Sequence, residues 1–526
     1  MAPPWLSRFA LISSVVAASA IVRRSAALRS HLARILGVTR WHLPRVDGVI
    51  EADVAIAGAG LGGLALSAAL RRRGFRVVVL ERAAAARYTS QGTIALWPNG
   101  LAALEAAGGA RLPAAVSKRG VAVEATEILN CGLHGSESTR RIEVGPHGVS
   151  AFFIPWAKVQ QELMAAAEEG EAVGGAVRGP WLLESWTLDG RGVLGALSSA
   201  LRRWRSPPWL MCSHEVAGFA EDAEAVEVRV AGGAAGAAPR VAVRASLLVG
   251  ADGLFSRVRA ALQGSPGGGV DLERINDYST TNWNAILRHA AIPGPRVVPR
   301  GESRILNLAS PKLSCYLVDC GEGELFWQIR QADAAWGHAQ RGAGLGRPGI
   351  KARLLSLFDE AEAAAGVGAR DILRVIRATA EEGIFERRIF DTQPLPAWSS
   401  AAGRVTLLGD AAHALHPTPG QGANQAFEDA AALAEALCDA ADRTGGGRRL
   451  RAEDVPAAVA TYEERRRRRA TAVQAWAAGG GRRQRDGTWQ RTKPGPEAEA
   501  FRQWVLKYPA PGEEASVPPV PNDISK

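Results

Sequence analysis

One glycine-rich stretch has the residue types and the position of an anion-binding site. Gly409 to Asn424 follows the apolar run 405–408 and precedes apolar residues at helical spacing. Those residues are Phe427, Ala430, Ala434 and Leu437. The order strand, glycine-rich turn, helix places Asn424 at the expected N-cap, and backbone N–H groups at a helix start attract negative charge. The alternative is an ordinary turn between a strand and a helix.

Two further stretches have nucleotide-binding patterns. Residues 54–63 form an apolar strand followed by G-x-G-x-x-G, and a helical pattern then leads to a second apolar run over 76–81. Glu81 ends that run, roughly 20 residues past the glycines, where an acid accepts hydrogen bonds from an adenosine ribose. Further along, Asp252-Gly253 follows the apolar run 247–250. A strand, a helix, a second strand and a terminal acid together favour a dinucleotide-binding unit.

These three stretches, in this order, resemble the single-component FAD-dependent monooxygenases of the aromatic hydroxylase and zeaxanthin epoxidase type. The likeness extends to residues 92–100 and to the Tyr-Glu-Glu-Arg-Arg sequence at 462–466, and it covers roughly residues 54–476. The implied fold is α/β. It has a Rossmann-like FAD-binding domain in three segments, like that of glutathione reductase, with an interleaved β-rich substrate domain and a C-terminal helix.

The resemblance implies FAD as the cofactor, with Gly60, Glu81, Asp252 and Asp410 as principal contacts. The full set of expected contacts is Gly58, Gly60, Leu61, Gly63, Glu81, Arg82, Asp252, Asp410, Pro417, Gly420, Gly422, Ala423 and Asn424. The sequence departs from the family at Trp156, where relatives commonly have an Arg or Gln that reaches the flavin.

In the resembled family NADPH or NADH reduces FAD, O2 adds to the reduced flavin as a hydroperoxide, and one oxygen atom passes to the substrate. The resemblance therefore implies hydroxylation or epoxidation of a hydrophobic or aromatic small molecule. The alternatives are a flavin-dependent reductase or halogenase on the same fold, or a non-catalytic flavin-binding relative, which the departure at Trp156 favours. No catalytic side chain is assigned, because no Ser-His-Asp set or paired-carboxylate signal is evident.

At 526 residues the chain is too long for one hydrophobic core. We expect an FAD-binding domain over 51–270 with an insertion near 165–210, a β-rich substrate domain over 271–392, and the last FAD-binding segment over 393–440. Residues 441–526 should form a C-terminal helix and a flexible tail. Because all five residues are arginine, the run 465–469 must surround its helix, and we expect most of these side chains to be solvated.

Residues 1–50 have the composition of a targeting segment. They contain seven Arg and one acid, Asp47, among many Ser, Ala and Leu residues, as organelle transit peptides do. The apolar run 9–22 is shorter than the ~20 residues that span a bilayer. We expect an organelle address, plastid before mitochondrion; the alternative is a disordered or membrane-surface tail on a cytoplasmic protein.

The remaining residue types exclude several classes of site. The five cysteines form no C-x-x-C pair, which indicates a reducing compartment. His413 and His416 lack a third ligand nearby, so no metal is expected. The net charge of +10 lies mostly in residues 1–50 and 461–493, so it does not indicate nucleic-acid binding.

Aromatic residues in the β-rich region are candidates to line a substrate pocket. They are Trp283, Tyr316, Phe326 and Trp327. Alternate side chains of a strand point to opposite faces of its sheet. Only part of this group can therefore reach one pocket.

Overall fold

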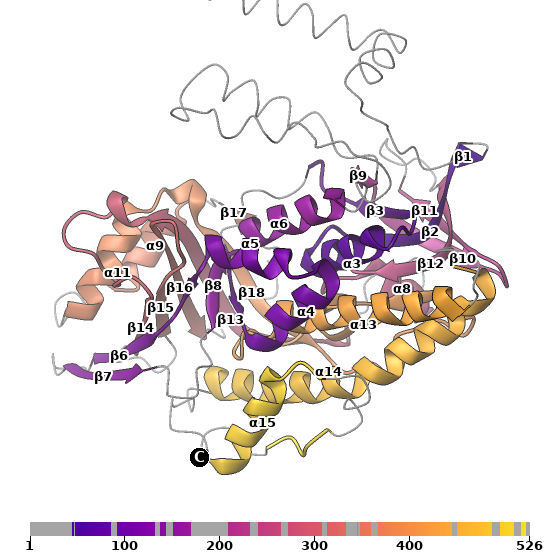
Figure 1. Ribbon diagram of the computed structural model, residues 1–526. Coiled ribbons are helices and arrows are strands. Elements are labelled where there is room, and N and C mark those ends of the chain that lie inside the picture. The colour runs from indigo at the N-terminus through magenta and orange to yellow at the C-terminus, as the bar shows by residue number, and fades with distance from the viewer. Residues whose placement is uncertain are drawn as a thin grey trace, which may run out of the picture.

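The computed structural model describes most of the chain, in two sheet-based layers joined by long helices (Figure 1). The described residues are 45–46, 48–85, 92–131, 137–143, 151–169, 209–231, 240–264, 272–307, 313–332, 344–345, 348–358, 367–443, 450–486, 495–509 and 517–521. The targeting segment expected over 1–50 lies almost wholly outside them, as does most of the insertion expected near 165–210.

The first sheet has eight strands in the order β10-β11-β12-β2-β3-β9, with β1 beside β2 and β19 beside β12. Their bounds are β1 Arg45–Val46, β2 Val49–Ala57, β3 Val77–Glu81, β9 Leu210–Cys212, β10 Val216–Glu221, β11 Val226–Val230, β12 Arg240–Gly250 and β19 Val405–Leu407. The strands β2, β3, β9, β12 and β19 pair in parallel. Buried parallel strands require apolar residues on both faces, as β2 and β3 have.

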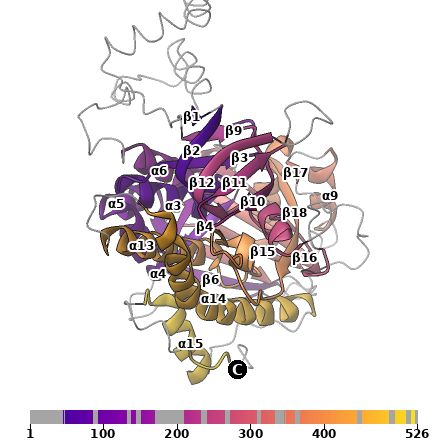
Figure 2. The same ribbon diagram turned by 90° about the vertical axis from the view of Figure 1, so that its right-hand side faces the viewer.

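Helices cover this sheet, and α3 is buried along almost its whole length. Their bounds are α3 Leu61–Arg72, α4 Pro98–Gly108, α5 Arg111–Arg119, α6 Trp156–Glu169, α8 Arg257–Leu262, α12 Asp410–His413 and α13 Gly422–Arg443. In Figure 2, α3, α4 and α13 lie together beside β2 and β12, consistent with their mutual contacts. A small sheet of β4 Thr93–Leu96, β8 Phe152–Pro155 and β5 Val121–Ala122 lies in the same part of the chain.

The second large sheet has the order β17-β18-β13-β16-β15-β14-β6-β7. The bounds are β6 Ala125–Cys131, β7 Glu137–Glu143, β13 Ile275–Arg288, β14 Glu302–Asn307, β15 Leu313–Asp319, β16 Glu324–Ala332, β17 Gly344–Leu345 and β18 Phe385–Thr392. Helices α9 Ile350–Ser356 and α11 Val367–Ala378 cover its far face (Figure 1). Strands β6 and β7 belong to this sheet, although the sequence placed them in the nucleotide segment 51–270.

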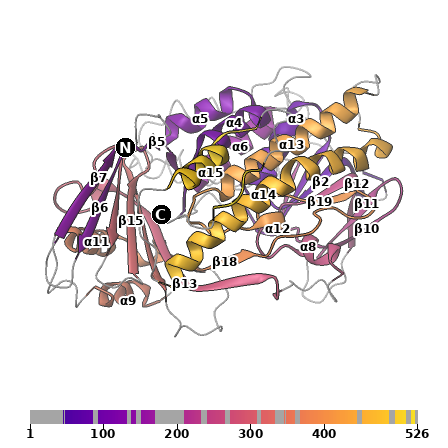
Figure 3. The same ribbon diagram turned by 90° about the horizontal axis from the view of Figure 1, so that it is seen from below.

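The C-terminal part is helical. Helix α14 Val455–Arg485 packs along α13 and reaches β13, so it bridges both sheets from below (Figure 3). A second helix, α15 Pro496–Leu506, follows it and buries Phe501 and Val505. The sequence analysis did not predict this helix. Short 3-10 turns lie at His289–Ala291, Glu381–Gly383 and Ala452–Asp454. Within the described part of the chain no helix has the length and apolar character to span a membrane.

Candidate flavin site

A cavity of about 820 Å³ lies between the two sheets. One wall is formed by the ends of β2 and β3, the start of α3 and the loops 251–257 and 408–426. The opposite wall is the inner face of the second sheet. Every expected FAD contact except Asn424 lines this cavity, because the carboxyl ends of neighbouring parallel strands meet at one edge of a sheet.

The glycines of the G-x-G-x-x-G motif at 58–63 have different structural roles. Gly58 has φ +103°, and a Cβ there would clash with the carbonyl oxygen of Ala251. A Cβ on Gly63 would clash with the carbonyl oxygen of Gly58, so both glycines are required by packing. Gly60, by contrast, has φ −69°, and its added Cβ would meet only the Ala251 oxygen, at 3.9 Å. The protein leaves the space beside Gly60 open.

The start of α3 is suited to an anion. Its N-cap is Gly60, which supplies no side chain to the N–H groups of the first turn, and the turn contains no acidic residue. Those N–H groups and the positive end of the helix dipole face the cavity, where a diphosphate would be stabilised.

Glu81 is held in a fixed orientation at the end of β3. Its Oε2 accepts a hydrogen bond from the Ala59 N–H at 2.9 Å, and its Oε1 accepts one from the Ala83 N–H at 2.8 Å. Each carboxylate oxygen has a second lone pair. The residue that the sequence assigned to a ribose is thus fixed beside the glycine loop.

Asp252 fixes the structure of the loop that follows β12, which contains the Asp252-Gly253 motif. Its carboxylate accepts hydrogen bonds from the Ser256 hydroxyl at 2.5 Å and from the Arg257 N–H at 2.8 Å, which caps α8. Burial raises the pKa of Asp252, and these hydrogen bonds oppose that shift. Arg259, on the same helix, donates to the carbonyl oxygen of Ala411 at 2.8 Å. The helix that follows the Asp252-Gly253 motif is therefore hydrogen-bonded directly to α12, which begins at Asp410.

Asp410 projects into the cavity from the first turn of α12. Its side chain remains accessible from the cavity although protein surrounds it. Burial raises its pKa, while His413, Arg387 and Arg259 act in the opposite direction. Because backbone N–H groups of the α13 start also face the cavity beside Gly422 and Ala423, this wall can stabilise negative charge.

Asn424 has a different role from the one the sequence suggested. Helix α13 begins at Gly422, so Asn424 lies inside the first turn and is not the N-cap. Its Oδ1 accepts from the Trp97 N–H at 3.0 Å, and its Nδ2 donates to the carbonyl oxygens of Ala95 and Gly420 at 3.0 and 2.8 Å. These hydrogen bonds of the Asn424 side chain hold the 417–424 loop against β4.

The polar atoms around the cavity fit a flavin nucleotide. Gln160 is buried and donates to the Ala59 carbonyl oxygen at 3.2 Å, yet its Oε1 has no partner among the described residues. Within the same part of the chain, the indole N–H of Trp97 is also buried without a partner, close to Gly420. Buried polar atoms normally find partners, and both residues line the cavity. A ligand with hydroxyl and carbonyl groups would satisfy them. Trp156 also lines this wall.

The opposite wall contains only part of the expected aromatic set. Tyr316 and Phe326 line the cavity. The other two candidates, Trp283 and Trp327, are fully buried on the other face of the sheet, against α9 and α11, and do not line the cavity. The two pairs lie on opposite faces because alternate side chains of a strand point to opposite faces of the sheet. The sequence analysis missed Arg330 and Arg387, which share the cavity face with Tyr316. Strand alternation alone does not reveal them, because it does not say how the strands pair or which face is inward.

A buried ionic cluster supports the site from behind. Arg466 on α14 donates to Glu428 and, at 2.8 Å, to Asp429, and Arg469 donates to Glu428 at 2.8 Å. Asp429 also accepts from the Gly409 N–H at 2.9 Å, next to Asp410. Arg466 and Arg469, which are 2% and 1% exposed, are therefore the exceptions in a run that was expected to be mostly solvated.

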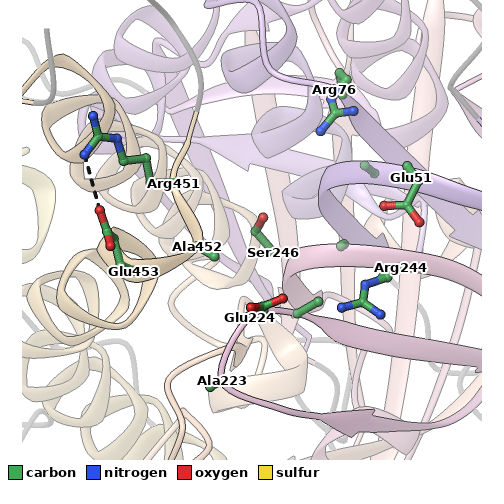
Figure 4. Close-up of a pocket in the computed structure, with 12 residues that line it drawn as sticks. Glu51, Arg76, Ala223, Glu224, Arg244, Ser246, Arg451, Ala452 and Glu453 are labelled. Atoms are coloured by element: carbon green, nitrogen blue, oxygen red, sulfur yellow. Dashed lines mark hydrogen bonds and ion pairs between the residues drawn. The ribbon is translucent and has the colours of Figure 1, made fainter. Parts of the chain in front are cut away.

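A second cavity, of about 690 Å³, lies at the other end of the first sheet (Figure 4). Charged side chains line it, and several already have partners: Arg451 with Glu453 at 3.3 Å, and Arg76 with Asp53 at 2.6 Å. It contains none of the motif residues. No group of metal-ligating side chains occurs among the described residues. The flavin-sized cavity is thus the candidate site.

Known proteins resemble this chain over most of its length. The family described as "FAD binding domain" matches residues 51–175 and 368–477. The aurachin C monooxygenase/isomerase of Stigmatella aurantiaca is 30% identical over 414 residues, which cover 78% of this chain and 84% of that protein. The chloroplastic zeaxanthin epoxidase of Nicotiana plumbaginifolia is 29% identical over 74% of this chain, but this chain spans only 49% of the epoxidase.

Solved structures share the fold. Klebsiella pneumoniae HpxO, solved with FAD and uric acid, is 20% identical with a TM-score of 0.57, covering 86% of this chain and 92% of that one. CtdE, solved with FAD and a substrate, is 16% identical with a TM-score of 0.61, covering 87% and 100%. Together with the motif geometry and the sequence relatives, this shows that the chain binds FAD and belongs to the family of FAD-dependent monooxygenases.

Proposed function

We propose that this enzyme uses NADH or NADPH to reduce its FAD and then inserts one oxygen atom of O2 into a hydrophobic or aromatic small molecule. The observation that carries the proposal is the cavity that the two sheets share. Its first wall holds the three nucleotide motifs, and its second holds Tyr316 and Phe326 of the substrate sheet. Cofactor and substrate would therefore meet in one enclosed space.

Bound FAD supplies the redox chemistry and the activation of O2. The chain's own residues would bind and orient the cofactor and the substrate and shield them from water. The first turn of α3 would hold the diphosphate, Glu81 and Gln160 would hold the adenosine ribose side, and the start of α13 would stabilise negative charge on the reduced cofactor. Apolar side chains of the second sheet exclude water from the place of oxygen transfer.

The relatives support the class of substrate. The names of the aurachin C monooxygenase and the zeaxanthin epoxidases state reactions on lipophilic molecules. The substrate wall of this chain includes Ile305, Tyr316 and Phe326, which suit an apolar or aromatic body. Hydroxylation and epoxidation both follow from the same oxygen transfer.

Isotope incorporation tests the proposal. Purified protein should contain about one FAD per chain and should oxidise NADH or NADPH faster when a substrate is present, with one oxygen-18 atom from labelled O2 in the product. A panel of phenolic, quinone-type and carotenoid compounds supplies candidate substrates. Dehydrogenation without label would favour a reductase, and a product that requires chloride would favour a halogenase. A flavin that neither nucleotide reduces with any ligand would favour a non-catalytic protein.

We further propose that residues 1–50 direct the protein to an organelle, plastid before mitochondrion. Their arginine-rich, acid-poor composition supports this, as does the chloroplastic designation of the zeaxanthin epoxidases. A fluorescent fusion of residues 1–50 should accumulate in plastids of plant cells. A diffuse cytosolic signal would contradict targeting, and a signal at membranes would favour a surface-binding tail.

A further inference from the structure

Two arginines lie side by side on the inner face of the substrate sheet. In the register of the sheet, Asn282 of β13 pairs with Arg330 of β16 on one side and with Arg387 of β18 on the other. Directly paired residues project from the same face. All three positions therefore share a face, and both arginines line the cavity between the sheets.

Arg387 lines the cavity, and its side chain is accessible to solvent there. Among the described residues it makes neither a hydrogen bond nor an ion pair. Burial lowers its pKa, and Asp410 across the cavity opposes that shift. A guanidinium group that no acid pairs leaves its hydrogen-bond donors available to an anion that enters the cavity.

Arg330 adds a second positive charge to the same patch. Its Nε donates to the Oδ1 of Asn282 at 3.2 Å, which orients the guanidinium group. Burial and the nearby charge of Arg387 lower the pKa of Arg330 to about 9. Burial and the same two arginines also lower the pKa of His416, to about 3, so that its imidazole is neutral. An anion bound between the guanidinium groups would offset their repulsion.

We propose that Arg387, assisted by Arg330, binds a carboxylate group of the substrate. This rests on the proposed oxygen-transfer function and narrows its substrate class to amphipathic acids with an aromatic or apolar body. Guanidinium groups bind carboxylates with two parallel hydrogen bonds. Apolar side chains of Ile305, Tyr316 and Phe326 lie on the same wall and would contact the rest of the molecule.

The diphosphate of FAD is a poor occupant for this patch. Its expected position is the first turn of α3 beside Gly60, which belongs to the opposite wall of the cavity. The arginines lie on β16 and β18 of the substrate sheet. The two anion-binding places are therefore built by different domains, and a substitution in one can be tested for its effect on the other.

Matched acids and amides test the subsite on the full-length, FAD-loaded protein. The probes are benzoate, 2-aminobenzoate and cinnamate, each compared with its neutral amide, and dissociation constants come from flavin absorbance changes and calorimetry. Each pair has nearly the same shape, so a difference reports the charge. In the unchanged protein at least one acid should bind tenfold or more tightly than its amide. Arg387→Gln should weaken that acid by roughly 30-fold and leave the amide within about twofold.

Arg388→Gln is the control, because Arg388 is already paired with Asp277 at 3.1 Å. It should preserve the preference for the acid. Equal binding of every acid and its amide would overturn the subsite, as would equal losses in the Arg387 and Arg388 variants or a loss of FAD from Arg387→Gln. Oxygen-18 incorporation with no preference for acids would refute the subsite alone. Protein without flavin would refute the proposed function itself.

Discussion

Arg466→Met is expected to lower the free energy of unfolding by about 3–5 kcal/mol, the usual cost of removing one partner from a buried ion pair. Arg466 lies between Glu428 and Asp429, and all three side chains are almost inaccessible to water. Without the guanidinium group, two buried carboxylates on neighbouring positions of α13 lose their shared counterion. Urea unfolding followed by circular dichroism measures the change.

The same variant should be more sensitive to acid. Although burial acts to raise it, the charges of His413 and Arg466 bring the pKa of Asp429 down to about 2. A carboxyl group with a depressed pKa stabilises the fold above its unfolded value of about 3.9, and this contribution disappears as the pH falls toward 2. Removal of Arg466 raises the pKa of Asp429 and moves the acid unfolding midpoint to higher pH.

Arg468→Met is the matched control for this experiment. Arg468 belongs to the same arginine run, but its side chain is exposed on α14. Its substitution should change the unfolding free energy by no more than about 0.5 kcal/mol. Similar effects of the two substitutions would show that the cluster contributes nothing beyond ordinary surface charge.

The cluster also shows where sequence reasoning ends. Five consecutive arginines indicate a helix surrounded by charge, but only the crossing of α14 over α13 brings Arg466 and Arg469 against Glu428 and Asp429. No periodic signal in either helix reveals this pairing. Long-range strand pairing is equally invisible: β6 enters the second sheet because it pairs with β14, whose residues lie more than a hundred positions later.

The nucleotide motifs could be placed from sequence because their chemistry is local. A glycine with positive φ, a helix start and an acid at a strand end are each defined within a few residues. The shared edge of a parallel sheet then brings the separate motifs together, as the cavity lining shows. The substrate wall lacked such a constraint. Which face of β13 or β16 is inward depends on α9 and α11, so Trp327 and Arg330 could not be sorted before the fold was known.

Gly60→Ala is expected to fold with nearly unchanged stability yet to lose its cofactor. The backbone of Gly60 has φ −69° and ψ 175°, which alanine adopts readily, and the added methyl group would meet no protein atom closer than 3.9 Å. The unfolding free energy of the FAD-free protein should therefore change by less than about 1 kcal/mol. The methyl group would, however, fill the space beside the first-turn N–H groups of α3, where the diphosphate must approach the backbone.

We expect FAD to bind Gly60→Ala at least 100-fold more weakly, which corresponds to about 2.8 kcal/mol. Titration of FAD-free protein, followed by quenching of flavin fluorescence, measures this loss, and urea unfolding of the same sample measures stability. Gly218→Ala serves as the control because its added methyl group also meets open space but lies on β10 outside the cavity. If Gly60→Ala retains FAD like Gly218→Ala, the diphosphate does not lie at this helix start. If it unfolds easily, Gly60 serves packing, as Gly58 and Gly63 do.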